Sequence, residues 1–258
     1  MTEMERFMKF HKESVVIDGM GGSAIPYDKL LAGGLTATNV TLDTRRGLAS
    51  VMDDAKLYYA LIEMVPDKVM LIEKADDINK AKESGRLGII FGLQDPLPLE
   101  ENTRVLSTVL YILYKLGIRI MQLSYNDANA LGCGCTEPDD TGLTSFGIQV
   151  VTVMNRLGMV VDLSHTGNRT SRDAAEVSDA PVIFSHANPL ALKNTPRNKP
   201  DDLIKLVAAK GGVIGIMPYT SFCKSEYGEW PTLEDFLDQI DYAVQLAGSL
   251  MGVTQAVC

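Results

Sequence analysis

The chain has 258 residues, 46% of them hydrophobic, and a formal net charge of −9 at pH 7. Its length and apolar content allow a large buried core, and α/β barrels of about 250 residues commonly form one domain, so we expect a single domain over residues 1–258. The acidic balance argues against nucleic acid and anionic membranes as partners and favours a small soluble substrate.

Taken in order, the chain repeats one pattern: a short apolar run rich in β-formers, a polar or glycine-rich loop, and a segment with helical period. This pattern predicts strands at 14–18, 35–41, 88–93, 118–123, 159–163, 181–185 and 212–217, with an extra short strand at 69–72. It predicts helices at 47–64, 78–84, 103–116, 146–157, 168–177, 202–210 and 233–247.

Strands that alternate with helices in this way approach the eight strands of a closed barrel. The predicted fold class is therefore α/β, a TIM-type (β/α)8 barrel that is short at its C-terminus. The residues after Gly248 suffice for a strand but not for its loop and helix. Either residues 250–257 supply the eighth strand, or the barrel is open between its first and seventh strands, which would leave an edge prone to aggregation.

The four cysteines, Cys133, Cys135, Cys223 and Cys258, show no paired framework. The Cys-x-Cys pair is too close for an ordinary disulfide and lacks a second ligand pair for zinc. The N-terminus is charged throughout, and no window approaches about 18 uninterrupted apolar residues. We therefore expect a cytoplasmic chain that does not span a membrane. The sequence leaves the oligomeric state open, with a homodimer among the alternatives.

Two of the predicted strands end in the same pair of residues. Strand 159–163 is followed by Ser164 and His165, and strand 181–185 ends at Ser185 and is followed by His186. A βαβ unit makes its strands parallel neighbours, and ligands of parallel sheets bind beyond the carboxyl ends of the strands. We expect His165 and His186 to face one pocket, whereas the third histidine, His11, is expected on the surface.

Two runs, FGIQVVTVMNRLGMVVDLSHTGNRTS and PVIFSHANPLALKNTPRNKPDDLIKLVAAKGGVIGI, resemble the membrane dipeptidase family (renal dipeptidase, peptidase M19) of zinc peptidases, within the amidohydrolase-type barrels. The similarity extends from Val15 to Asp241 and beyond, and it is most specific around DLSH, SHAN and PRNxPDD. The resemblance implies a (β/α)8 barrel with two zinc ions at its C-terminal face and hydrolysis of dipeptides or related amides. Coordination by such a metal makes water a nucleophile near neutral pH.

Carried over by position, the resemblance gives His165 and His186 the role of ligands to one zinc. It gives Arg197 the role of holding the substrate carboxylate, which suits a planar bidentate donor. Tyr125 stands where the family has a histidine that polarises the scissile carbonyl. The acid/base aspartate of strand eight lies in a segment that the chain lacks or has replaced, with Gln255 among the candidates.

Other positions depart from the family. Met20 and Gly22 replace a His-x-Asp pair that binds the other zinc, and Gln94 replaces the carboxylate that bridges both ions. A neutral amide binds zinc far more weakly than a carboxylate. We therefore expect at most one zinc ion, held by His165 and His186 with Gln94 or water, or no metal at all.

Two function classes stay open. The first is a divergent hydrolase acting on a dipeptide or a small amide that carries a carboxylate, with Tyr125 stabilising the oxyanion and Arg197 anchoring the carboxylate. The second is a non-catalytic relative that binds a small carboxylated ligand at a metal-free barrel mouth.

Structural roles for the same residues also stay open. The two histidines could be remnants of a metal site that only form hydrogen bonds with neighbouring groups. Arg197 could form a structural salt bridge with the aspartates that follow it. Asp162 could orient a metal ligand or make an ordinary strand-end bond. Cys133 and Cys135 are expected as small loop residues. The acidic residues of that loop are expected to be solvated: Glu137, Asp139 and Asp140.

Overall fold

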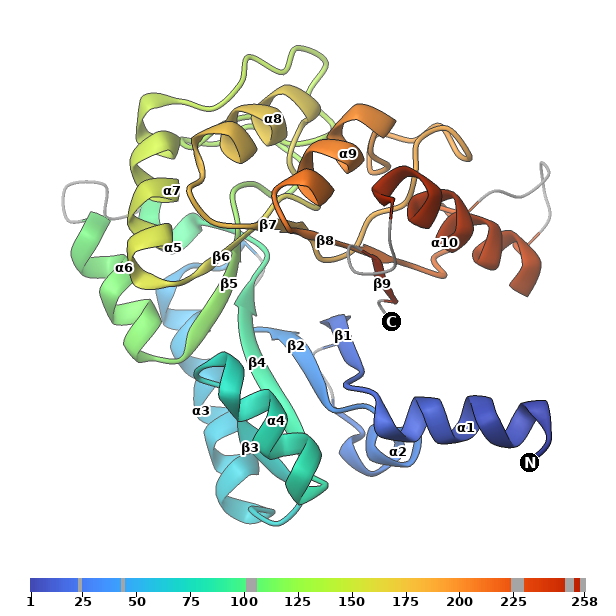
Figure 1. Ribbon diagram of the computed structural model, residues 1–258. Coiled ribbons are helices and arrows are strands. Elements are labelled where there is room, and N and C mark those ends of the chain that lie inside the picture. Colours follow the sequence, from blue (N-terminus) through green and yellow to red (C-terminus); the bar gives the residue numbers. More distant parts are fainter. Residues whose placement is uncertain (23–24, 43–44, 101–105, 224–229, 249–252, 256–258) are drawn as a thin grey trace.

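Eight parallel strands form the wall of a nearly closed barrel in the computed structural model (Figure 1), which describes residues 1–22, 25–42, 45–100, 106–223, 230–248 and 253–255. In spatial order, these strands are β1 (Ile17–Gly21), β2 (Ala37–Thr41), β4 (Leu87–Leu93), β5 (Ile118–Gln122), β6 (Val160–Asp162), β7 (Val182–Phe184), β8 (Val213–Ile216) and β9 (Val253–Gln255). The predicted fold class, a TIM-type barrel, is confirmed.

The short strand predicted at 69–72 is present as β3 (Val69–Leu71), outside the barrel path. It pairs with the first half of β4, while β5 pairs with the end of β4. Every residue of β4 is buried, as expected for a parallel strand covered on both faces.

The eighth strand, β9, lies within the predicted 250–257 segment and pairs with β8. It also lies against β1, but the described residues contain no backbone ladder between β9 and β1. The two strands are therefore neighbours, but in this part of the structure no backbone hydrogen bonds between described residues seal the barrel between them. The rest of the segment, Cys258 and the start of the helix predicted at 103–116 lie outside the described residues.

The helices follow the expected alternation with the strands. They are α1 (Glu3–Glu13), α2 (Tyr27–Ala32), α3 (Leu48–Met64), α4 (Ala75–Ser84), α5 (Leu97–Glu100), α6 (Leu106–Lys115), α7 (Ser145–Leu157), α8 (Asn168–Val177), α9 (Asp201–Ala209) and α10 (Leu233–Ala247). Helices α7 to α10 succeed one another around the outside of β6, β7 and β8 (Figure 1). None of the helices in the described part of the chain has the length and hydropathy needed to cross a bilayer.

Local signals explain where the helix before β6 begins and ends. Thr144 accepts a hydrogen bond from the backbone N–H of Gly147 and so caps α7, and Gly158 ends the helix in the left-handed conformation, at φ 77°. The chain then enters β6 directly. This sharp end to the helix brings Asp162 and the residues after it to the carboxyl end of the sheet.

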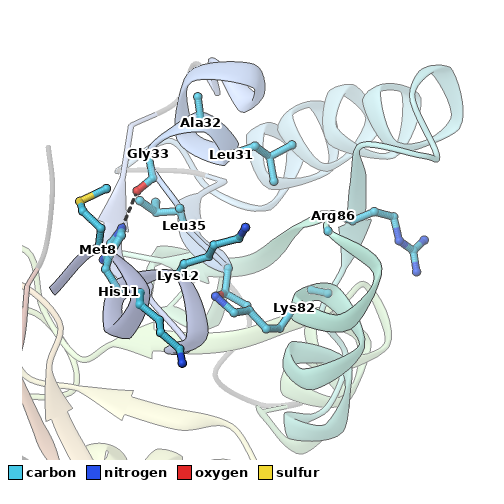
Figure 2. Close-up of a pocket in the computed structure, with 14 residues that line it drawn as sticks. Met8, His11, Lys12, Leu31, Ala32, Gly33, Leu35, Lys82 and Arg86 are labelled. Atoms are coloured by element: carbon cyan, nitrogen blue, oxygen red, sulfur yellow. Dashed lines mark hydrogen bonds between the residues drawn. The ribbon is translucent and has the colours of Figure 1, made fainter. Parts of the chain in front are cut away.

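The first strand begins three residues later than predicted, because Ser14 still belongs to the end of α1. Sequence reasoning missed this helix, although Thr2 and Glu5 carry its capping box. His11 in α1 was expected on the surface, but it is only partly exposed and its Nε2 lies 2.8 Å from the carbonyl oxygen of Gly33 (Figure 2). His11 therefore ties α1 to the turn after α2.

The same region contains a cavity of about 860 Å³ lined by side chains such as Met8, Lys12, Lys82 and Arg86 (Figure 2). It lies where the chain enters β2 and β4, which is the amino end of the strands. The predicted site residues lie at the carboxyl end. The cavity is thus on the opposite side of the barrel from the candidate site.

Candidate active site

The predicted site residues lie at the carboxyl rim, which we define as the loops that follow the barrel strands. Gln94 follows β4, Tyr125 follows β5, His165 follows β6 and His186 follows β7. Arg197 lies in the loop between β7 and α9. In a parallel barrel these loops meet on one face, where side chains from different strands can act together.

The structure brings His165 and His186 together, and we call them the histidine pair. Their Nε2 atoms lie 2.9 Å apart, and the ring centroids are separated by 4.9 Å. Both side chains are buried. The pair comes from neighbouring strands, because β6 and β7 are directly paired.

A buried carboxylate determines which nitrogen of His186 carries the proton. Ser185 donates its hydroxyl proton to Asp162 Oδ2, and its oxygen lies 2.7 Å from His186 Nδ1. Since that hydroxyl has a single proton, Ser185 must accept from Nδ1–H, which leaves Nε2 unprotonated in the neutral ring. Asp162 also accepts from the hydroxyl of Ser164 (2.6 Å) and the side-chain amide of Gln122 (2.9 Å). Asp162 therefore orients His186 through Ser185, and it also makes the strand-end bonds that the sequence left open, since it accepts from the backbone N–H groups of Ser164 and Ser185.

The other ring is held in the same way by an amide. His165 Nδ1 lies 2.7 Å from the carbonyl oxygen Oδ1 of Asn126, an acceptor, so Nδ1 of His165 carries the proton. Asn126 adopts a left-handed conformation, at φ 68°. Both Nε2 atoms consequently present lone pairs to each other. Two lone pairs at this distance repel unless a proton or a cation lies between them.

Burial keeps both rings neutral. It is the main cause that lowers the pKa of His165 and of His186, and the nearby Arg197 guanidinium lowers both further. Asp162 opposes this effect on the pKa of His186. A neutral imidazole with a free Nε2 is the form that binds a metal ion.

Arg197 and Lys199 brace the turns that carry the histidine pair. The guanidinium of Arg197 donates to the carbonyl oxygens of Ser164 and His186 and lies over the Phe222 ring. Lys199 is fully buried and donates to the carbonyl oxygen of Thr166 at 2.5 Å. Burial lowers the pKa of Lys199 to about 7.

The aspartates after Arg197 have other partners. Asp201 accepts from the Tyr242 hydroxyl, and Asp202 pairs with Arg172. Within the described residues neither forms an ion pair with Arg197. The structural salt bridge that the sequence left open for Arg197 is therefore not formed there.

Gln94 faces β1 and β2. Its amide nitrogen donates to Thr41 Oγ1 at 2.8 Å and to the sulfur of Met20 at 3.3 Å. In the described residues no hydrogen bond joins Gln94 to the histidine pair. Met20 and Gln94, two of the positions where the resemblance implies ligands of the second zinc, are thus hydrogen-bonded to one another.

Tyr125 covers one face of the histidine pair. Its ring stacks on His165 with a centroid distance of 4.1 Å and an interplanar angle of 19°. The side chain is half-buried, so part of it stays accessible from the carboxyl rim.

The loop between β5 and α7 forms hydrogen bonds with the start of α8, next to the site. Asp140 was expected to be solvated, but it accepts hydrogen bonds from the backbone of Arg169 and from the backbone and hydroxyl of Thr170. This prediction was wrong because Asp140 stabilises the first turn of α8 with its negative charge. Cys133 is buried in this loop, Cys135 is partly exposed, and both are free thiols.

Sequence reasoning missed Asn126, Ser185 and Lys199 as partners of the site. The repeated Ser-His pair was the available signal for Ser185. Asn126 and Lys199 carried no local signal, since each meets its partner across at least 33 residues of chain.

The donor set fits a single metal ion better than two. The two free Nε2 atoms converge, and each ring is oriented by a second hydrogen bond, as is typical of metal-binding histidines. Among the described residues, no group of three or more histidine, cysteine, aspartate or glutamate side chains is placed to hold an ion. A two-ion centre of the kind that the resemblance implies needs a bridging carboxylate, and Gln94 stands at that position, so such a centre does not fit these residues.

Comparison with known proteins gives a consistent result. The family model described as "Membrane dipeptidase (Peptidase family M19)" matches residues 28–253. The chain is 34% identical over 198 residues to dipeptidase verJ of Clonostachys rogersoniana, which covers 76% of this chain and 49% of the relative. It is 30% identical over 218 residues to an uncharacterized dipeptidase of Schizosaccharomyces pombe, covering 83% of this chain and 50% of that protein. The chain thus spans about half the length of these curated relatives.

A solved structure shows the same fold. It is an amidohydrolase from Pseudomonas aeruginosa, with a TM-score of 0.89 and 33% sequence identity. The match covers 97% of this chain and 75% of that one.

Proposed function

Since the chain belongs to the membrane dipeptidase family (peptidase family M19), we propose that it hydrolyses a dipeptide or a related small amide that carries a carboxylate. The site works with one metal ion, for which zinc is the proposed identity. The observation that carries this proposal is the 2.9 Å approach of two unprotonated Nε2 atoms in the histidine pair. A cation between them would relieve the repulsion of their lone pairs.

His165 and His186 would hold the ion, and Gln94 would complete the ligand set through its side-chain oxygen or through water. A divalent ion supplies Lewis acidity there, which lowers the pKa of water and polarises a carbonyl. Ser185 and Asn126 keep the two rings in the tautomer that binds the ion.

Tyr125 is the proposed oxyanion donor. Its ring stacks on His165, which supports a role for its hydroxyl as a donor to an oxyanion formed beside the histidine pair. Arg197 stays the carboxylate anchor predicted from the sequence, although both of its terminal nitrogens donate to backbone carbonyls.

The second candidate is a non-catalytic relative that binds a small carboxylated ligand. The observation in its favour is the bond from Gln94 to Met20, because these two positions satisfy each other without a metal ion. This candidate requires a protein that purifies without metal and does not turn over dipeptides.

Metal analysis of protein purified without chelator tests the proposal, together with hydrolysis of a panel of L,L- and L,D-dipeptides. We expect about one ion per chain in the wild type, as in single-ion catalytic sites, and loss of both metal and turnover in His165→Ala. The control is His11→Ala, which changes the histidine on the opposite side of the barrel and should keep the ion. A wild type that contains no metal and hydrolyses no dipeptide would overturn the hydrolase proposal and favour the second candidate, a non-catalytic relative that binds a carboxylated ligand.

A further inference from the structure

The cavity of about 860 Å³ at the amino end of the strands lies between α1, α2 and α4 (Figure 2). We call it the amino-end cavity, and its 14 lining residues include Lys12, Leu31, Leu35 and Lys82. They come from the second halves of the three helices and from the residues that lead into β2 and β4. Pockets that hold small molecules commonly measure about 300–1,000 Å³. The amino-end cavity is therefore large enough for an organic ligand.

The lining of this cavity is basic, although the chain as a whole is acidic. Lys9, Lys12, Lys82 and Arg86 line it, and among the described residues no aspartate or glutamate does so. The chain has a formal net charge of −9, so the lining differs in sign from the average of the molecule. A concave surface lined by one sign of charge attracts ligands of the opposite sign. The amino-end cavity therefore favours an anion.

Lys12 and Lys82 are the two cations whose ammonium groups stay available. Lys12 belongs to α1 and Lys82 to α4, and Figure 2 shows their side chains reaching toward each other from the two helices. Neither lysine forms an ion pair or a hydrogen bond with any described residue. By contrast, Lys9 lies 3.8 Å from Glu13, and Arg86 donates to the end of α4. An anion in the cavity would therefore meet Lys12 and Lys82 without displacing a protein partner.

The helix ends at the cavity offset only part of this positive charge. Helices α1, α2 and α4 all present their C-terminal ends to it. Each helix C-terminus carries at most about half a negative charge, so three of them amount to at most about 1.5. The lysine and arginine side chains of the lining exceed that value. An excess of positive charge consequently remains for a ligand.

The rest of the lining is mainly apolar. Met8 of α1, Leu31 of α2, Leu35 before β2 and Ala81 of α4 contribute side chains to it. Such a surface gains stability when an apolar part of a ligand removes it from water. Available ammonium groups beside apolar side chains match an organic anion with an apolar body better than a bare inorganic ion.

A ligand that contacts both lysines would also hold α1 in place. No residue of α1 is buried, and His11 Nε2, at 2.8 Å from the carbonyl oxygen of Gly33, ties this helix to the turn after α2. Lys12 and Lys82 are far apart in the sequence but line the same cavity. A ligand between them would join α1 to α4, so binding should slow the opening of α1.

We propose that the amino-end cavity binds a small organic anion, an apolar group that carries a carboxylate or a phosphate, through Lys12 and Lys82. The two ammonium groups contact the anionic group, and the apolar lining contacts the rest of the ligand. The cavity lies on the opposite side of the barrel from the histidine pair, so this site is separate from the proposed hydrolase site. Carboxylate and phosphate share the negative charge that the lysines recognise, and the experiment distinguishes them.

Calorimetry on the purified full chain tests this inference with three probes of equal chain length: octanoate, octyl phosphate and neutral 1-octanol. We expect at least one anion to bind at least about 10-fold more tightly than 1-octanol, the size expected of charge-assisted contacts. Tighter binding of octyl phosphate would identify a phosphate as the preferred group, and tighter binding of octanoate would identify a carboxylate.

Lys12→Gln and Lys82→Gln should each weaken binding of the preferred anion about 3- to 10-fold and leave 1-octanol unchanged. Lys82→Arg should keep most of the affinity, because it keeps the charge. The matched control is Lys205→Gln, which removes an exposed lysine of α9 that does not line the cavity. Hydrogen exchange of the α1 amides should slow when the anion binds to the wild type and to Lys205→Gln.

The inference is overturned if neither anion binds more tightly than 1-octanol. It is also overturned if the double variant Lys12→Gln/Lys82→Gln keeps the preference for the anion, because the anion would then bind elsewhere on the molecule. These outcomes do not depend on metal content or on dipeptide turnover, so they leave the hydrolase proposal untouched.

Discussion

Asp162 reaches His186 through a single hydroxyl group, that of Ser185. Ser185 donates to the carboxylate of Asp162 and accepts from Nδ1 of His186, so the charge of Asp162 fixes the tautomer of a ring that it does not touch. The same carboxylate accepts from the hydroxyl of Ser164. One acidic residue at the end of β6 thereby orders both Ser-His turns.

Ser185→Ala should weaken zinc binding about 10- to 100-fold, because His186 loses the acceptor that keeps Nε2 free. Competition with a chromophoric chelator measures the affinity. Ser178→Ala is the matched control, since Ser178 is equally buried but bonds to Asn155 and Ala180 away from the rim. Equal zinc affinities in the two variants would contradict the role of Ser185 in keeping Nε2 of His186 free.

Tyr125→Phe should lower kcat about 10²- to 10³-fold, the usual effect of removing one oxyanion donor. The ring that stacks on His165 is kept, so metal content and stability should not change. Steady-state kinetics with the best dipeptide of the panel provides the measurement, with the exposed Tyr111→Phe as control. Unchanged kcat in Tyr125→Phe would remove the hydroxyl from the mechanism.

Lys199 should make the free energy of unfolding depend on pH. Its pKa in the folded chain is about 7, below the ordinary value of about 10.4 for an unfolded chain. Between these two values the unfolded state holds more protons, so stability rises with pH, by up to about 1.4 kcal/mol per pH unit. Below about pH 7 both states carry the proton and this slope disappears.

Urea unfolding between pH 6 and 9 checks this expectation. The stability difference between the wild type and Lys199→Met should grow above neutral pH in favour of the wild type. Lys205→Met, at an exposed position of α9, should track the wild type at every pH. A constant difference for Lys199→Met would mean that the buried amine keeps its ordinary pKa.

Gly134→Ala should destabilise the protein by about 1–3 kcal/mol, the range typical of overpacking. A Cβ atom at Gly134 would lie 1.9 Å from the backbone oxygen of Asn126, which must move. Because Asn126 holds His165, zinc binding should weaken as well. Gly22→Ala is the control, since a Cβ there meets nothing within 4 Å. Denaturant unfolding measures the loss of stability, and chelator competition measures the zinc affinity. If Gly134→Ala matches Gly22→Ala in both, the contact between Gly134 and Asn126 does not hold His165 in place.

Local sequence patterns determined much of this protein. The alternation of apolar runs and helical periods predicted the strands and most helices, because hydrophobic periodicity follows directly from the geometry of each element. It also put His165 and His186 at the ends of neighbouring parallel strands. The missed α1 carried a capping box at Thr2 and Glu5, which is likewise a local signal.

Only the tertiary structure decided how the site residues meet. The contact between Asn126 and His165, the burial of Lys199 and the capping of α8 by Asp140 each join segments about 30 or more residues apart. Such contacts depend on how the loops after different strands fold over one rim, which no local pattern encodes. For the same reason, only the tertiary structure shows that Arg197 is buried and donates to the backbone carbonyl oxygens of Ser164 and His186.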